Sequence, residues 1–265
     1  DGCDQLDDLA ATMYVYDKPT VTYTSDPYFI VGEPGNFAVT ITNPVTGKNY
    51  ANTVVFDVVL QGHAVEDITA ISCTDGTTTW NLIGSLTQDG ANVKARIGGL
   101  TDGFFTIPAP LTITLPCTVT YATAGTYTTS TSMVDVVSPL PERVVSADIP
   151  GTATVYAKPV ITPTNLAGPF DAGVQETVSL SIANTAIPEP FEVVFTYPAG
   201  TVIVYNGVTY TCAATCPVIP VDLTAEPTVL DFLVTFDEAW TGDVSVSLYD
   251  SDWTPADRLL ATASA

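Results

Sequence analysis

Phe37-Ala38-Val39-Thr40-Ile41-Thr42 places apolar side chains at every second position, with small or polar ones between them. Because successive side chains of a β-strand point to opposite faces, this run predicts a strand with one buried and one solvated face. The same pattern recurs at residues 178–183 and 244–248. Turn sequences separate such runs, among them Asn206-Gly207, which is typical of tight hairpins. The sequence therefore predicts an all-β protein of antiparallel sandwiches.

The composition excludes several classes of protein. The 265 residues include 7 Lys+Arg against 29 Asp+Glu, which gives a formal net charge of -22. Intrinsic disorder combines high net charge with low hydrophobicity, and here 46% of the residues are hydrophobic. Seven scattered cations do not form the basic footprint of a nucleic-acid-binding protein. No apolar run approaches the roughly 20 residues of a membrane-spanning helix, so we expect no membrane insertion.

The same composition indicates an extracellular or cell-surface location. Thr and Val are abundant, and the five Cys fit an oxidising compartment better than a cytosolic one. The chain begins at Asp1, which suggests a processed secreted form or an excised fragment of a longer protein.

An internal repeat predicts two tandem domains. Residues 11–19 (ATMYVYDKP) match residues 151–159 (GTATVYAKP) at Thr, Val, Tyr, Lys and Pro. We therefore expect one sandwich at 17–150 and a second at 151–265, preceded by an N-terminal extension strand within residues 1–16.

Two segments carry a resemblance to a known family. The segment Tyr28–Pro44 resembles the opening of immunoglobulin-like repeats in large secreted or cell-surface bacterial proteins. The segment Ala124–Thr128 resembles the penultimate strand of these repeats, in which a tyrosine, here Tyr127, anchors a corner by hydrogen bonding to backbone. The second domain has no clear equivalent of Tyr127. The resemblance implies immunoglobulin-like folds that serve as spacers, adhesin stalks or assembly modules, with no shared catalytic residues.

The cysteines predict two disulfides and one remaining thiol. Cys73 and Cys117 both lie in the middle of the first domain, and Cys212 and Cys216 enclose three residues of the second. We expect Cys73–Cys117 and Cys212–Cys216 bonds, because a metal site at the second pair would require a His or another Cys pair nearby. Cys3 is either a free thiol or bonded to another chain.

The repeat also suggests that the second domain lacks a strand. In the first domain the run beginning at Arg143 continues into residues 151–156, whereas the matching run from Arg258 stops at Ala265. The sequence counterpart of residues 151–156 is the segment 11–16. We therefore expect head-to-tail homopolymers in which this segment adds as a β-strand to the second domain of a neighbouring copy.

The residues expected at the contact between copies are Cys3, Ala11, Thr12, Met13, Tyr14, Val15 and Tyr16. Two alternatives remain open. The second domain could end at its last strand with residues 11–16 used inside the first domain, or the chain could be an excerpt from a longer tandem array.

Residues that could carry chemistry are few. His63 follows a strand at a predicted turn and has no recognisable nucleophile and acid partners, so we interpret it as a solvated loop residue and expect no enzymatic activity. Asp250, Asp252 and Asp257 place oxygen ligands near a strand end, as a calcium site would. They lack the full calcium-loop pattern, and solvated loop carboxylates are the alternative. We expect no other cofactor.

These observations together predict an extracellular structural protein, a subunit of a bacterial filament, sheath or surface layer. The alternative is an adhesin or a ligand-binding stalk module of a larger surface protein, which would act through exposed loops such as Gly84–Phe105.

Overall fold

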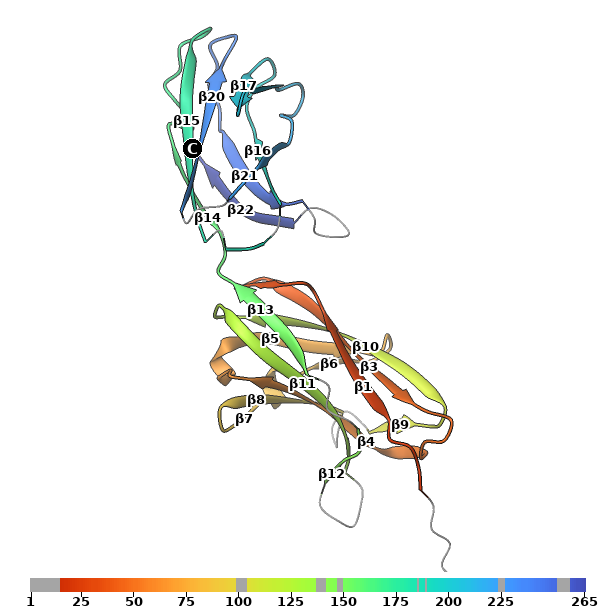
Figure 1. Cartoon of the computed structure of the whole chain (residues 1–265). Helices are drawn as coiled ribbons and strands as arrows, with labels where there is room; N and C mark the ends of the chain where they lie inside the picture. The colour runs from red at the N-terminus through yellow and green to blue at the C-terminus, as the bar shows by residue number, and fades with distance from the viewer. Residues whose placement is uncertain are drawn as a thin grey trace, which may run out of the picture. The chain divides into compact units, whose positions relative to one another are not determined.

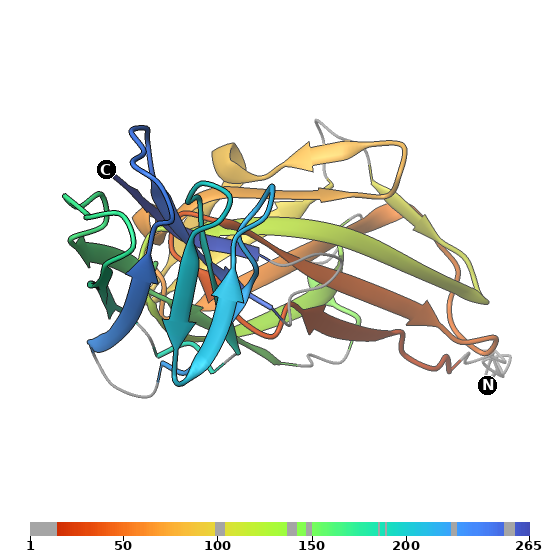
Figure 2. The same ribbon diagram turned by 90° about the horizontal axis from the view of Figure 1, so that it is seen from above.

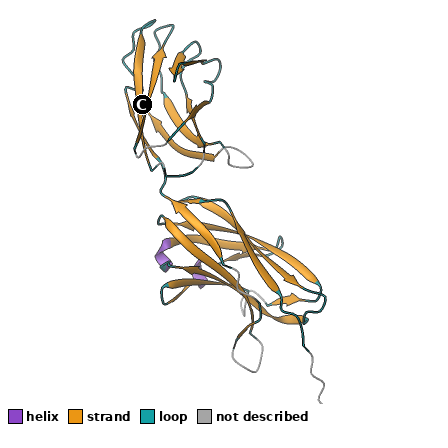
Figure 3. Ribbon diagram, in the orientation of Figure 1, coloured by secondary structure: helices purple, strands orange, loops and turns teal. Residues whose placement is uncertain are grey.

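The computed structural model describes residues 15–98, 104–136, 142–146, 150–184, 186–188, 190–223, 227–251 and 258–265. The chain divides into two compact units, Asp1–Val155 and Tyr156–Ala265. Each unit is an antiparallel β-sandwich, as expected from the sequence, and the helical residues that are described form only two single turns, Val65–Asp67 and Ile83–Ser85 (Figures 1 and 3).

The first unit packs two sheets face to face, and Figure 2 shows its strands from a second direction. One sheet has the strand order β1-β3-β10-β5-β6, and the other has the order β2-β13-β11-β4-β8-β7, with β12 beside β11 and β9 beside β4. The strands are β1 (Thr20–Ser25), β2 (Phe29–Ile30), β3 (Pro34–Asn43), β4 (Tyr50–Gln61), β5 (Ile68–Thr74), β6 (Thr79–Asn81), β7 (Thr87–Asp89), β8 (Asn92–Ile97), β9 (Phe105–Ile107), β10 (Leu111–Tyr121), β11 (Gly125–Asp135), β12 (Arg143–Val144) and β13 (Gly151–Tyr156).

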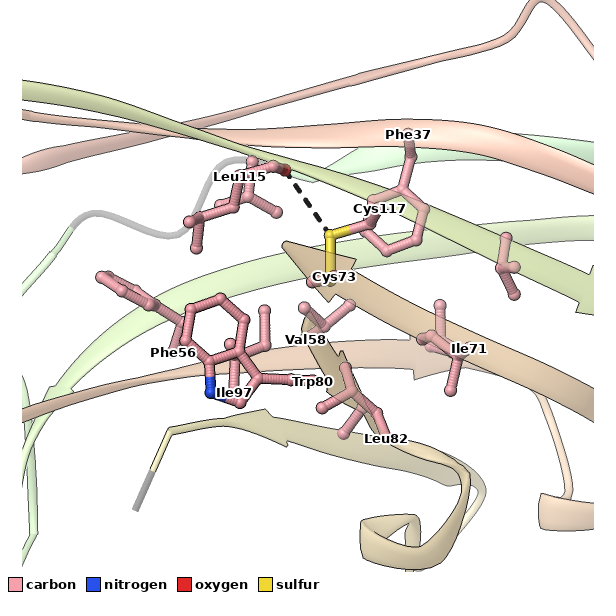
Figure 4. Packing of buried hydrophobic residues seen from close by; sticks show 14 of the residues in the cluster. Phe37, Phe56, Val58, Ile71, Cys73, Trp80, Leu82, Ile97, Leu115 and Cys117 are labelled. Carbon is pink, nitrogen blue, oxygen red and sulfur yellow. Dashed lines mark hydrogen bonds between the residues drawn. A yellow bond between two sulfur atoms is a disulfide. The ribbon is translucent and has the colours of Figure 1, made fainter. Parts of the chain in front are cut away.

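The alternation that predicted strand β3 forms the core of this unit. Phe37, Val39 and Ile41 are buried between the two sheets, while Thr40 and Thr42 of the same strand face outward. Each large apolar side chain removed from water contributes about 1.5–3 kcal/mol, which makes this interior the main source of stability. Figure 4 shows part of the interior, including Phe37, Phe56, Trp80 and Leu115 around a disulfide.

The second unit is a smaller sandwich of two sheets. Its strand orders are β14-β15-β20-β17-β18 and β19-β16-β21-β22. The strands are β14 (Val160–Thr164), β15 (Gln175–Ala183), β16 (Phe191–Phe195), β17 (Val202–Tyr205), β18 (Val208–Thr211), β19 (Ile219–Val221), β20 (Thr228–Thr235), β21 (Ser245–Asp250) and β22 (Arg258–Ser264).

Several local predictions for this unit are confirmed. The run 178–183 lies in β15, and Val178, Leu180 and Ile182 are fully buried. Asn206 and Gly207 form the two-residue turn between β17 and β18, with φ values of 49° and 78°. Positive φ at both central residues is the requirement of a type I′ turn, which Asn-Gly meets at little cost.

The boundary between the two units lies at residues 155/156, five residues beyond the predicted boundary at 150/151. Residues 151–155 of β13 pair in register with residues 125–129 of β11 and therefore belong to the first sandwich. The second copy of the repeated segment, at residues 151–155, is thus the last strand of the first unit.

The prediction that the second domain lacks its final strand is wrong. The sequence match itself is correct, because Asp135 pairs with Arg143 and Asp250 pairs with Arg258. In the first unit, however, the long strand β11 has β12 along one part of its edge and β13 along the other. In the second unit β21 is shorter, and β22 alone pairs along its whole length. The second unit needs no equivalent of β13, because β21 has no equivalent of residues 125–129 of β11, with which β13 pairs.

Candidate functional site

Both disulfides expected from the sequence are present, and they close loops of very different length. Cys73 and Cys117 are register partners on neighbouring strands β5 and β10, and both side chains are buried in the core (Figure 4). The Cys212–Cys216 bond closes a short loop after β18, with a sequence separation of 4 against 44 for the first bond. The first bond therefore constrains a much larger part of the unfolded chain than the second.

The segment expected to mediate assembly is described only at its end. Cys3 and residues 11–14 lie outside the described residues. Val15 and Tyr16 are 86% and 50% exposed, so neither is used in the core of the first sandwich. Asp17 forms an isolated bridge with Gly47, and the first ladder strand begins at Thr20.

The predicted calcium ligands are not brought together among the described residues. Asp250 is fully buried at the end of β21, paired across the sheet with Phe191 and Arg258, and Asp252 and Asp257 lie outside the described residues. Within the part of the chain that the structure describes, no three acidic, His or Cys side chains are placed to hold a metal ion. The calcium site stays a prediction.

His63 is buried rather than solvated, which corrects the prediction from sequence. Its exposed fraction is 2%, and its ring stacks on Tyr127 and on Tyr121 with centroid distances of 3.5 Å and 5.2 Å. Burial lowers its pKa from 6.5 to about 4, although the carboxylate of Asp67, 3.9 Å from Nδ1, acts in the opposite direction. The reason lies in Gly62, whose φ of 79° interrupts the alternation of β4 and turns the next side chain inward.

The predicted tyrosine corner is present beside this histidine. The Tyr127 hydroxyl donates to the carbonyl oxygen of Ala124 at 3.3 Å and lies 3.1 Å from the Thr123 hydroxyl. The Thr123 hydroxyl in turn donates to Asp67 at 3.0 Å. Tyr127, Thr123 and Asp67 thus join β11 to the short helix Val65–Asp67, as a structural element rather than a binding surface.

The segment Gly84–Phe105, expected as an exposed loop, is exposed at residues 84–85 and 87–91 but also contains a buried strand. Where it is described, it forms mainly the hairpin of β7 and β8, and Val93, Ala95 and Ile97 of β8 are completely buried. The alternation of these residues in Asn92-Val93-Lys94-Ala95-Arg96-Ile97 is the signal in the sequence that identifies the strand.

An ion-pair cluster lies on the outer side of β4 and β8, and sequence reasoning did not find it. Asp57, 3% exposed, accepts two hydrogen bonds from Arg96 at 2.6 and 2.8 Å and lies 2.6 Å from Lys94 Nζ. Arg96 also donates to both carboxylate oxygens of Glu142, at 2.7 and 2.8 Å, and thereby lowers the pKa of Glu142. A buried carboxylate requires such partners, because an unpaired buried charge is costly. The cluster is consistent with stabilisation of the fold.

A groove crosses the outer face of the sheet β1-β3-β10-β5. Ala38 and Pro116 are register partners on β3 and β10, and their small side chains form the floor of a cavity of about 480 Å³. Hydroxyl and amide groups line its sides, and Ser72 and Thr118 hydroxyls lie 3.0 Å apart. The one acidic side chain of the lining is Asp26, which accepts a hydrogen bond from the Asn36 backbone at 2.6 Å. The groove therefore combines a mostly apolar lining with hydroxyl and amide groups, and its lining has little charge.

Comparison with known proteins does not place the chain in a family. No family model matches the sequence, and no curated protein matches it. Among solved structures, the macrocyclisation protein AvmM of alchivemycin A biosynthesis is 11% identical, with 55% of this chain and 96% of that chain covered and a TM-score of 0.41. The B domain of a biofilm-associated protein is 12% identical, with coverages of 97% and 88% and a TM-score of 0.40.

The partial N-terminal region of an enterococcal surface protein is 10% identical, with coverages of 96% and 97% and a TM-score of 0.38. Two of these three structures are thus named for a surface or a biofilm, and one for a biosynthetic reaction. A likeness at this level does not determine what either sandwich does. In the described part of the chain, no helix is long and apolar enough to cross a membrane.

Proposed function

We propose that this chain is a non-enzymatic module of an extracellular or cell-surface protein, in which two immunoglobulin-like sandwiches present a binding groove as part of an adhesin. Disulfides persist in oxidising compartments, and two of them support the extracellular location. The single observation that carries the adhesive function is the groove above Ala38 and Pro116. The names of the surface and biofilm neighbours agree with the proposal, which does not depend on them.

The chemistry of the groove favours a neutral saccharide as its ligand. Threonine and serine hydroxyls both donate and accept hydrogen bonds, as sugar hydroxyls do. Asp26 and the net charge of -22 disfavour an anionic ligand. The groove is open rather than enclosed, which suits one face of an extended chain of sugars.

An oligosaccharide array tests this function. The intact chain is expected to bind neutral oligosaccharides, and Ala38→Tyr, which fills the floor of the groove, is expected to abolish that binding. Thr22→Tyr is the matched control, because Thr22 lies on the same sheet face but outside the groove. Binding that survives Ala38→Tyr, or an intact chain that binds no sugar on the array, would contradict the proposed ligand.

Head-to-tail assembly by strand addition is the second candidate, and one observation favours it. β22 is the last strand of its sheet among the described residues, whereas β13, which pairs with β11 in the first unit, is followed by β2. An edge strand presents unpaired backbone groups that can accept a strand from another chain. Addition would extend a complete sheet rather than fill a missing position.

Removal of residues 1–16 tests strand addition. In electron micrographs the intact chain is expected to form filaments, and the truncated chain to stay folded and monomeric. Cys3→Ser in the intact chain distinguishes assembly by strand addition from assembly by a disulfide at Cys3. Filaments of the truncated chain would exclude this mode of assembly.

A further inference from the structure

The few cations of this acidic chain are unevenly placed. Of the seven Lys and Arg residues, Lys18, Lys48 and Arg143 line one cavity of about 420 Å³ at the end of the first sandwich where β1 begins (Figure 1). Tyr16 and Tyr50 line the same cavity. We call this region the cationic pole, defined by Lys18, Lys48, Arg143, Tyr16 and Tyr50.

Among the described residues, the acidic groups near the cationic pole are already engaged. Asp135 is buried and lies 3.6 Å from Lys48, and Asp17 accepts a hydrogen bond from the Thr46 hydroxyl. Glu142 is held by Arg96, outside the cavity. Within the described residues, Lys18 and Arg143 have no ion pair, so both are available to an incoming carboxylate.

Exposed apolar side chains accompany these cations. Val15 is 86% exposed and Val144 is 55% exposed, and both line the same cavity. The Lys48 ammonium lies 5.0 Å from the centre of the Tyr50 ring. Partly apolar surroundings with fixed cations are suited to an aromatic anchor flanked by carboxylates.

The second sandwich carries the complementary set at one of its ends. The loops from β14 to β15 and from β20 to β21 lie at the end away from Val160 and expose acidic side chains with no Lys or Arg. Trp240 is 42% exposed there, and its ring packs on Gly242, where an added Cβ would lie 2.4 Å from the ring. The two cations of this unit, Lys158 and Arg258, lie near its other end, at the start of β14 and at the start of β22. We call the first set the acidic pole, which consists of Asp171, Asp237, Glu238, Asp243 and Trp240.

We propose that the cationic pole of one chain binds the acidic pole of a second copy of this chain, with Trp240 inserted among Tyr50, Lys18 and Arg143. Two different surfaces meet in such a contact, so it is heterologous and continues head to tail unless it closes into a ring. Chains with a net charge of -22 repel each other over most of their surface. The cationic pole instead attracts negative charge, so the acidic pole of another copy is the partner that fits it.

Charge reversal combined with mixing tests the contact. Sedimentation velocity of the intact chain at low ionic strength is expected to show association that grows with concentration. Lys18→Glu/Arg143→Glu and Asp237→Lys/Glu238→Lys should each weaken it by about tenfold or more, since two attractions become repulsions. An equimolar mixture of these two variants should associate again, because each reversed pole finds its complement in the other chain.

The controls separate this contact from other modes of assembly. Lys158→Glu alters an exposed cation outside the cationic pole and should leave association unchanged. Trp240→Ala should weaken it at unchanged net charge. Removal of residues 1–14 should leave the pole contact intact, whereas it would abolish strand addition. A monomeric intact chain at all concentrations, or a mixture that fails to associate, overturns the proposal.

Discussion

The two sandwiches share a fold but are stabilised differently. The first holds a disulfide inside its core, a buried carboxylate with two cationic partners and a buried histidine. The second holds a buried disulfide that closes a short loop, and an aromatic interior in which the Phe232 ring lies 5.0 Å from Phe195 and 4.7 Å from Tyr205. Both interiors also contain a buried carboxylate, Asp57 in the first sandwich and Asp250 in the second. The comparison predicts that the stability of the first sandwich depends more strongly on redox state and pH than that of the second.

The disulfides should give the largest contrast. Cys73→Ala/Cys117→Ala should lower the free energy of unfolding of the first sandwich by about 4 kcal/mol, against about 2 kcal/mol for Cys212→Ala/Cys216→Ala in the second, because loop entropy grows with loop length. Guanidinium denaturation followed by fluorescence measures the first effect through Trp80, which is buried beside this disulfide. Equal losses for the two pairs would contradict the entropic account.

Removal of one cationic partner of the buried Asp57 carboxylate should have the second-largest effect. Arg96→Met leaves Asp57 with Lys94 alone and is expected to destabilise the first sandwich by about 3 kcal/mol. Arg143→Met is the matched control, since Arg143 is exposed and has no ion pair with a described residue, and it should change stability by less than about 0.5 kcal/mol. Urea denaturation of both variants at neutral pH and low salt makes the comparison.

Acid should destabilise the first sandwich through His63. The folded-state pKa of about 4 lies below the ordinary 6.5, so the unfolded chain takes up the proton first. Stability is therefore complete above pH 6.5 and falls as the pH drops towards 4, by about 2–3 kcal/mol. His63→Phe keeps an aromatic ring packed on Tyr121 and Tyr127. This variant should not show the loss of stability between pH 6.5 and 4.5. Thermal unfolding across this range measures it, and the second sandwich, which has no His, is the internal control.

The tyrosine corner should give the smallest effect. Tyr127→Phe removes the hydroxyl that bonds Ala124 and should cost the first sandwich about 1 kcal/mol. Tyr210→Phe is the comparison and should be nearly neutral, because Tyr210 is a half-buried residue of the otherwise exposed strand β18 in the second sandwich. A neutral Tyr127→Phe would show that ring packing against His63, rather than the hydroxyl, holds the corner.

How far the sequence could predict this molecule depends on the range of the interactions. The strand containing Phe37 and the Asn206-Gly207 turn follow from local periodicity and backbone preference, and both were predictable. His63 was not, because one positive φ at Gly62 decides which way the side chain points. The cluster around Asp57 joins residues as far apart as 57, 96 and 142, and local pattern carries no signal for such contacts.

The last strand of the second domain shows a different limit. Arg258 was correctly matched to Arg143, yet the lengths of β11 and β21 decided whether another strand was needed. The length of a paired strand depends on how far its neighbouring strand also continues, and the sequence of one strand alone does not reveal this. The groove above Ala38 likewise required the register between β3 and β10.

The Cys73–Cys117 bond also has a mechanical consequence. When tension pulls on the chain from both sides of the first sandwich, the residues between these two cysteines cannot extend, because the covalent bond carries the load past them. With a sequence separation of 44, the unfolded unit is shortened by roughly 150 Å relative to its reduced form. The short loop of the second sandwich withholds only about 15 Å. Under load, the first sandwich is therefore the stiff element of the pair, and the oxidation state of one buried bond sets the maximum length of the chain.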